Sequence, residues 1–269
     1  RNNNPVSCRG FYEDSNKNLY MMSNAYGIYK KEYGENYFER IELTETKPSG
    51  PNDFWSFGFE FENDSICWGY GYAHYIYQID LNKKTKTKFI MPSWYTKIRP
   101  SSVLDVVFLD KNTLLVGGEA GLIKFDKTSG KFFSSELYDK ENNLKGTHIT
   151  DLLFSKDLKL LFIGTKGKGL FVYDLNSGEI EQYTKNTKDL KLIDNSVICI
   201  FLDKNKTAWV GTNKGIQGLN LDKRETITFN GIGNQNLNKV VGIIEHNDSL
   251  WVSSYNGLLR SEEHTSELQ

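Results

Sequence analysis

The segment Ala208-Trp-Val-Gly-Thr-Asn-Lys-Gly-Ile-Gln-Gly-Leu-Asn220 decides the fold, because the chain repeats it several times. Clear copies occupy residues 114–126, 161–174 and 250–259, and weaker copies begin at Leu19 and Ile66. The second residue of each copy falls at Tyr20, Cys67, Leu115, Phe162, Trp209 and Trp251, so neighbouring copies are 42 to 48 residues apart. A period of about 40–50 residues is typical of the blades of a propeller.

Every copy lies within the same succession of short segments. An apolar strand comes first, for which we expect residues 103–109, 149–154 and 197–202, and a polar turn links it to the strand quoted above. A glycine turn, a third strand and an Asp-to-Gly turn follow, and a more polar fourth strand ends the unit, as at residues 131–138 and 179–184. Four short strands per unit predict an all-β fold. No segment holds apolar residues at helical spacing for long enough to favour a helical solenoid.

We therefore predict an incomplete β-propeller over residues 1–259, with five four-stranded blades and a truncated sixth. Residues 44–53 are expected to be the loop that leads into the second blade, and no domain linker is visible. The last ten residues, 260–269, resemble the translation of a sequencing adapter, so we expect them to be a foreign tail.

Composition excludes several functional classes. The 269 residues carry a net charge of -1, so the chain has no overall attraction to nucleic acid or to an anionic membrane. Its 3 cysteines are odd in number and far apart, which predicts neither a disulfide framework nor a metal cluster. No apolar run approaches the roughly 18 residues that span a bilayer.

No catalytic motif is present. The sequence lacks a Gly-x-Ser-x-Gly elbow, a His-Glu-x-x-His pair and a Walker loop. Residues 164–169 (Gly-Thr-Lys-Gly-Lys-Gly) resemble a phosphate loop, but they join two strands and precede no helix, so a structural turn is the better interpretation. Outside the tail, His74, His148 and His246 belong to different blades. We predict no catalytic residue, no metal site and no cofactor.

Two sets of loops are expected to share one face of such a fold. They are the leading loops, which precede the first strand of each blade, and the middle hairpins, which join its second and third strands. Together they surround the central funnel, where a concave site can form. Their aromatic, amide and charged groups are of the types that stack on and hydrogen-bond a sugar. The candidate ligand-binding residues are Trp94, Arg99, Ser102, Glu119, His148, Lys166, Asn195, Asn213, Lys214, Lys239 and Tyr255. The alternative is that these are ordinary solvated loops.

The repeat, with its Asp-Lys-Asn turn, Trp-Val-Gly-Thr strand and Lys-Gly-Ile turn, resembles the two-component regulator propeller repeat. The resemblance covers nearly all of the chain up to Leu259 and implies a complete ring of seven blades. It also implies a non-enzymatic sensor that lies in the periplasm and responds to glycan fragments, as in the hybrid two-component systems of Bacteroidetes. An upstream signal peptide, a downstream membrane helix and a histidine kinase would then belong to the parent protein.

The implied partners are an oligosaccharide, a neighbouring propeller and an immunoglobulin-like domain of the same chain, and a second copy in a homodimer. No nucleic acid is expected to bind to this part of the protein. Two other functions stay open. A propeller lyase or glycoside hydrolase would need paired carboxylates or histidines near the funnel, where only Glu119 and scattered histidines are expected. An interaction scaffold would have no small-molecule site.

Overall fold

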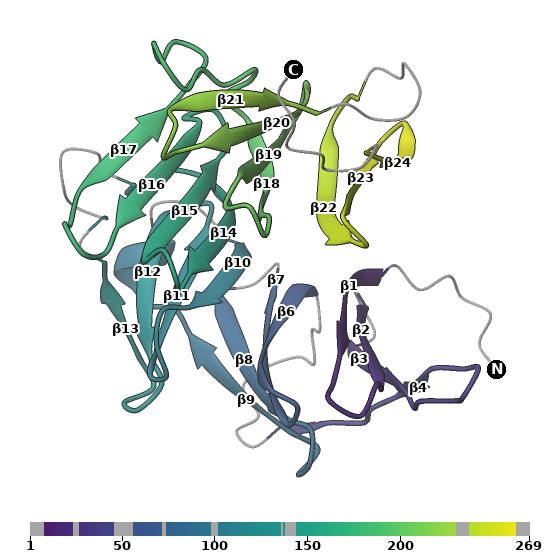
Figure 1. The fold of residues 1–269 in the computed structure, drawn as a ribbon. Helices are drawn as coiled ribbons and strands as arrows, with labels where there is room; N and C mark the ends of the chain where they lie inside the picture. Colours follow the sequence, from purple (N-terminus) through teal and green to yellow (C-terminus); the bar gives the residue numbers. More distant parts are fainter. Residues whose placement is uncertain are drawn as a thin grey trace. The chain divides into compact units, whose positions relative to one another are not determined.

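The computed structural model describes residues 8–23, 27–45, 56–71, 74–97, 102–135, 137, 144–229 and 237–261 (Figure 1). The chain divides into two compact units, Arg1–Gly146 and Thr147–Gln269, which we call unit 1 and unit 2. Helix α1 (Ser93–Thr96) is short, and among the described residues no helix is long and apolar enough to cross a membrane.

Unit 1 contains three sheets, in each of which four antiparallel blade strands follow one another in sequence order. The first sheet consists of β1 (Cys8–Glu13), β2 (Leu19–Ser23), β3 (Gly27–Lys31) and β4 (Glu39–Arg40). The second contains β6 (Ser56–Asn63), β7 (Ile66–Gly71), β8 (Tyr75–Asp80) and β9 (Thr85–Ile90). The third contains β10 (Val103–Phe108), β11 (Thr113–Gly118), β12 (Gly121–Asp126) and β13 (Lys131–Ser134).

Unit 2 continues the same arrangement. Its first sheet consists of β14 (Ile149–Ser155), β15 (Leu160–Thr165), β16 (Leu170–Asp174) and β17 (Ile180–Tyr183). The second contains β18 (Val197–Leu202), β19 (Ala208–Thr212), β20 (Gly215–Asn220) and β21 (Glu225–Thr228), and the third contains β22 (Val240–His246), β23 (Ser249–Ser254) and β24 (Gly257–Arg260). Among the described residues, the predicted five four-stranded blades and shorter sixth are therefore present.

The predicted inner strands agree with the structure to within one residue, whereas the outer strands are shorter than predicted. The strand expected over residues 131–138 ends at Ser134. At the next residue a side chain makes the hydrogen bond to the neighbouring strand, since the Ser135 hydroxyl donates to the carbonyl of Leu122 at 2.9 Å. Tyr138 itself lies outside the described residues. The strand expected over residues 179–184 is Ile180–Tyr183.

The prediction of a plain loop at residues 44–53 is wrong at its start. Thr44 and Glu45 form the short strand β5 (Thr44–Glu45), which pairs in parallel with the outer edge of β9. A buried ion pair holds β5 there, since Lys88 Nζ lies 3.7 Å from Glu45 Oε1 and the two side chains are only 5% and 8% exposed. Residues 46–53 lie outside the described residues.

Each of the six described inner strands contains a register shift near its beginning. The shifts fall at Cys8/Gly10, Ser56/Gly58, Val103/Asp105, Ile149/Asp151, Val197/Cys199 and Val240/Gly242. A bulge bends a strand and increases its twist. The repeat therefore includes a backbone irregularity as well as a sequence motif.

The large side chain at the second position of the quoted strand packs against the next blade. Trp209 is 2% exposed and belongs to a buried cluster with Val240, Ile243 and Val252 of the following sheet. Phe162 is fully buried in the equivalent cluster one blade earlier. These contacts join consecutive sheets within unit 2.

The predicted foreign tail falls mostly outside the described residues. Strand β24 runs to Arg260, and the backbone N–H and hydroxyl of Ser261 both bond to Leu250, each at 2.8 Å. Residues 262–269 are not among the described residues.

Candidate functional site

In unit 2, consecutive blades bring several predicted site residues together through their backbones. The N–H of Lys166 donates to the carbonyl of His148 at 2.9 Å. The N–H groups of Gly167 and Gly169 donate to the carbonyl of Asn195, at 3.0 and 2.9 Å. The middle hairpin of one blade is thus fastened to its own leading loop and to the leading loop of the next blade.

The next two blades of unit 2 repeat this connection. The N–H of Lys239 donates to the carbonyl of Asn213 at 3.0 Å, and the N–H of Tyr255 donates to the carbonyl of Lys239 at 3.3 Å. The Lys239 ammonium donates to the Tyr255 hydroxyl at 2.7 Å and lies 4.2 Å from the centroid of its ring. Lys214 Nζ lies 3.8 Å from Asp194 Oδ2 in the preceding leading loop.

Some side chains of these loops hold the loops in place through hydrogen bonds, and others are exposed to solvent. The Oδ1 atom of Asn195 accepts the N–H of Lys185 at 2.7 Å, so this amide already holds the loop in place. By contrast, Asn213 and Lys166 are exposed, and the Tyr255 residue is 69% exposed. The exposed groups are the ones available to a ligand.

Unit 1 brings together a smaller set of predicted residues. The N–H of Glu119 donates to the carbonyl of Ser102 at 3.3 Å. Trp94 lies in α1 and is 42% exposed, while the neighbouring Tyr95 is buried and donates to the carbonyl of Gly121 at 2.9 Å. Arg99 lies outside the described residues.

The glycine-rich segment 164–169 is a structural turn, as predicted. The Thr165 hydroxyl donates to the carbonyl of Gly169 at 2.7 Å and closes the turn. The N–H groups that a phosphate would need are donated to the Asn195 carbonyl instead.

Groups with catalytic potential are dispersed or buried in the described part of the chain. His148 directly precedes β14, whereas His246 is the last residue of β22, so the two lie at opposite ends of their blades. Burial raises the pKa of the Cys67 and Cys199 thiols far above the usual range, so both thiols stay protonated at neutral pH. No group of three or more metal-ligating side chains occurs among the described residues.

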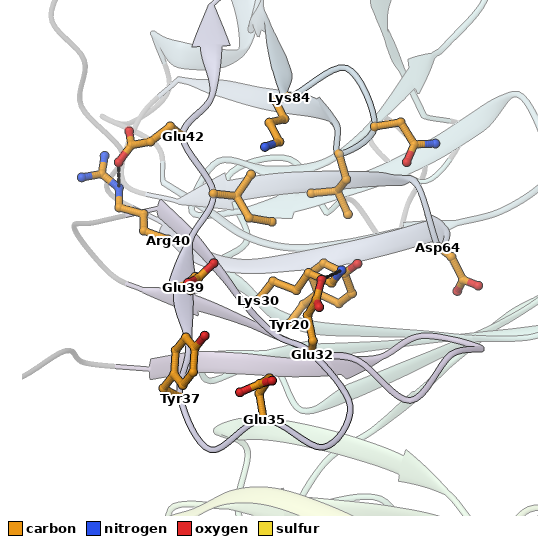
Figure 2. Close-up of a pocket in the computed structure, with 13 residues that line it drawn as sticks. Tyr20, Lys30, Glu32, Glu35, Tyr37, Glu39, Arg40, Glu42, Asp64 and Lys84 are labelled. Carbon is orange, nitrogen blue, oxygen red and sulfur yellow. Dashed lines mark hydrogen bonds and ion pairs between the residues drawn. The ribbon is translucent and has the colours of Figure 1, made fainter.

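The sequence analysis missed a polar cavity in unit 1 (Figure 2). Its volume is about 410 Å³. It is lined by Tyr20, Lys30, Glu32, Glu35, Tyr37, Glu39, Arg40, Ile41, Glu42, Asp64, Leu81, Asn82 and Lys84. Most of these residues come from the turns after the first and third strands, at the opposite end of the strands from the leading loops. The signal in the sequence is the charged segment 30–42, which replaces the short turn found in other copies.

Five acidic and three basic side chains line the cavity, and several of them are already paired. Lys30 bonds to Glu32 at 3.0 Å, and Arg40 lies 3.5 Å from Glu42. Within the described residues, the side chains of Glu35, Glu39 and Lys84 have no ion-pair partner.

Asp64, at one edge of the cavity, is held by hydroxyl groups from the first blade. It accepts hydrogen bonds from the Ser15 hydroxyl and from the Tyr12 hydroxyl, the latter at 2.9 Å. These bonds lower the pKa of the Asp64 carboxyl below its usual range. Burial together with the Asp64 charge raises the pKa of Tyr12 to about 12. Both groups therefore keep fixed charge states at neutral pH.

The meander of four-stranded antiparallel blades defines this protein as a β-propeller. Residues 191–214 match the family model described as "Two component regulator propeller", so the chain contains a repeat of that family. The matched segment begins in a leading loop, includes β18 and β19, and ends in the middle hairpin at Lys214.

Solved structures with the same fold include two proteins from B. thetaiotaomicron. The extracellular domain of BT3049, described as a hybrid two component system, has a TM-score of 0.70 at 16% identity; 96% of this chain and 34% of that chain are covered. The extracellular domain of BT4673, described as a one component system, has a TM-score of 0.64 at 19% identity, with 98% and 39% covered.

The computationally designed Ika8 protein also shares the fold, with a TM-score of 0.62 at 11% identity, and 96% and 71% covered. The chain spans little more than a third of the length of the two bacterial domains. A comparison with curated proteins finds no match.

Proposed function

We propose that this chain is the propeller part of a non-enzymatic sensor domain that lies in the periplasm and responds to glycan fragments. The observation that carries the proposal is the family match at residues 191–214, because this segment contains Asn195, Asn213 and Lys214 of the candidate loops. The chain also shares its fold with the extracellular domains of BT3049, described as a hybrid two component system, and BT4673, described as a one component system, and this likeness supports the same role.

The exposed groups of unit 2 suit a sugar ligand. The Tyr255 residue is 69% exposed, and the Lys239 ammonium lies 4.2 Å from the centroid of its ring. An exposed aromatic ring offers a face for the C–H surface of a sugar, while Asn213 and Lys214 supply hydrogen-bond donors for its hydroxyl groups. Such a set of groups binds a polyol without any chemical reaction.

Signalling would proceed by a shift in population. A ligand changes the balance between two arrangements of a sensor only by its difference in affinity for them. The arrangements would involve a neighbouring propeller, an immunoglobulin-like domain and a second copy of the protein. A membrane helix and a histidine kinase further along the parent protein would receive the change.

Calorimetric titration of the chain with a panel of oligosaccharides tests the proposal. We expect Asn213→Ala and Tyr255→Ala to weaken binding without lowering the unfolding midpoint. Asn176→Ala is the matched control, because Asn176 lies in the β16–β17 turn at the other end of the blade and is exposed. Binding that is lost only through Asn176→Ala would contradict the site, and no binding to any glycan would favour the scaffold function.

A further inference from the structure

We infer that the polar cavity of unit 1 is a second ligand site, and that it binds a small sugar carrying a protonated amino group. The inference rests on the proposed function for the ligand being a sugar. The amino group and the location follow from the cavity itself, which lies at the opposite end of the strands from the leading loops.

The size of the cavity fits one or two sugar rings. Small-molecule sites in proteins have volumes of about 300–1,000 Å³, and this cavity has about 410 Å³. It lies between two blades, because its lining comes from the β3–β4 loop and β4 of the first blade and from the β6–β7 and β8–β9 turns of the second. These elements belong to one compact unit.

The charges of the lining favour a cation. Lys30 and Arg40 are already paired with Glu32 and Glu42, so two of the three basic groups are neutralised within the protein. The carboxylates of Glu35 and Glu39 have no ion-pair partner in the described part of the chain. A ligand ammonium would form charge-assisted hydrogen bonds with them, which are about twice as strong as neutral ones.

The cavity also has surfaces that suit a sugar ring. Tyr37 is 56% exposed and stands beside Glu35 and Glu39 in Figure 2, on the side formed by the β3–β4 loop. An exposed tyrosine ring stacks readily on an apolar ligand face. Leu81 adds an apolar contact, and Asn82 adds an amide that donates and accepts.

An organic cation fits better than a metal ion. A calcium ion takes 6–8 oxygen ligands at short distance, and the described residues contain no group of three or more carboxylate, histidine or cysteine side chains that would hold a metal. An anionic sugar is disfavoured because five acidic groups face three basic ones.

Calorimetric titration of the chain at neutral pH with glucosamine, glucose and glucuronic acid tests the inference. We expect glucosamine to bind about tenfold more tightly than glucose, and glucuronic acid to bind most weakly. Added salt would reduce the preference for the amine. Equal affinity for glucosamine and glucose would overturn the inference.

Charge-neutral variants locate the site. Glu35→Gln and Glu39→Gln would each reduce the preference for glucosamine several-fold, and Glu39→Asp would retain it. Both residues are exposed, so we expect the unfolding midpoints to stay unchanged. Glu179→Gln, at an exposed turn of unit 2, is the matched control. A preference unchanged by both glutamine variants would overturn the inference.

The same experiment separates this site from the leading loops. If Asn213→Ala and Tyr255→Ala abolish glucosamine binding while the cavity variants leave it intact, the cavity inference fails and the proposed function stands. If the cavity variants alone weaken glucosamine, the second site is supported. Absence of binding to every sugar would overturn both.

Discussion

The indole Nε1–H of Trp209 donates a hydrogen bond of 2.8 Å to Oδ2 of Asp203, six residues earlier in the chain. The other carboxylate oxygen of Asp203 accepts the N–H groups of Asn205 and Thr207, at 2.9 and 2.8 Å. One buried carboxylate therefore shapes the turn between β18 and β19 and also fixes the side chain that packs against the next blade.

The first blade repeats this pairing at the equivalent position, where the Tyr20 hydroxyl donates to Asp14, six residues earlier, at 3.3 Å. In the second blade the equivalent position is Cys67, and the neighbouring Trp68 indole donates instead to Glu62 of β6 at 3.1 Å.

Replacing Trp209 measures how much the contact between blades contributes. We expect Trp209→Ala to lower the free energy of unfolding by roughly 3–5 kcal/mol, as for other buried large aromatic residues. Trp209→Phe would lose chiefly the hydrogen bond, at about 1–2 kcal/mol. Denaturant titration measures both. Lys214→Ala is the control, since its side chain is 71% exposed, and equal midpoints for Trp209→Ala and Lys214→Ala would contradict the strand register.

Stability is expected to depend on the protonation of Glu60. Burial, and then the charge of Asp105, raises the pKa of Glu60 to about 7. A carboxyl whose pKa is raised by folding stabilises the folded state fully below its unfolded pKa, and this contribution disappears as pH rises through the folded pKa. We expect the free energy of unfolding to fall by roughly 1–3 kcal/mol between about pH 4.5 and 7.5.

Denaturant titrations across that pH range test this dependence. Glu60→Gln removes the titrating group and would flatten the curve, while Glu179→Gln at an exposed turn would leave it unchanged. A slope that persists in Glu60→Gln would show that another group causes it.

Two glycines of one turn are expected to respond differently to alanine. Gly167 has a φ of +101° and open space around it, so Gly167→Ala would cost only the backbone strain of about 1–2 kcal/mol. Gly169 has a φ of +81°, and an added Cβ would lie 2.0 Å from the carbonyl oxygen of Tyr183. We therefore expect Gly169→Ala to show the lower unfolding midpoint, and the reverse order would contradict the described turn.

Strand β5 gives a test of buried against exposed ion pairs. Glu45→Ala would remove the buried carboxylate that faces the Lys88 ammonium, and we expect a loss of about 3 kcal/mol. Glu225→Ala removes an exposed pair with Lys223, whose side chains are 43% and 63% exposed, and we expect less than about 1 kcal/mol. Similar unfolding free energies for the two variants would show that the buried ion pair contributes no more than an exposed one.

The blade strands were predictable because the same physical demands recur in every copy. In β11, β15 and β19 the second strand is buried on both faces, so the second position of the repeated segment carries Leu, Phe or Trp, and tight turns require glycine or aspartate. These demands placed residues 164–169 in a turn, as the structure confirms.

Other features leave no common signature in the sequence. The bulges occur beside glycine in three inner strands, beside aspartate in two and beside cysteine in one, so no one residue type marks them. Strand β5 pairs with β9 and carries a buried ion pair between residues far apart in the sequence. The cavity forms where the charged segment 30–42 of the first blade meets turns of the second blade. This segment occurs in one copy only, so the pattern shared by the copies does not predict the contact.

The hydrogen bonds from Gly167 and Gly169 to Asn195 have a mechanical consequence. The loop that presents Lys166 to the outside is the same loop that fastens one blade to the next. A ligand that displaced this loop would strain or break the hydrogen bonds between the two blades. A ligand bound at Lys166 would then change the distance between the two sheets, because the hydrogen bonds that join them begin in the same loop.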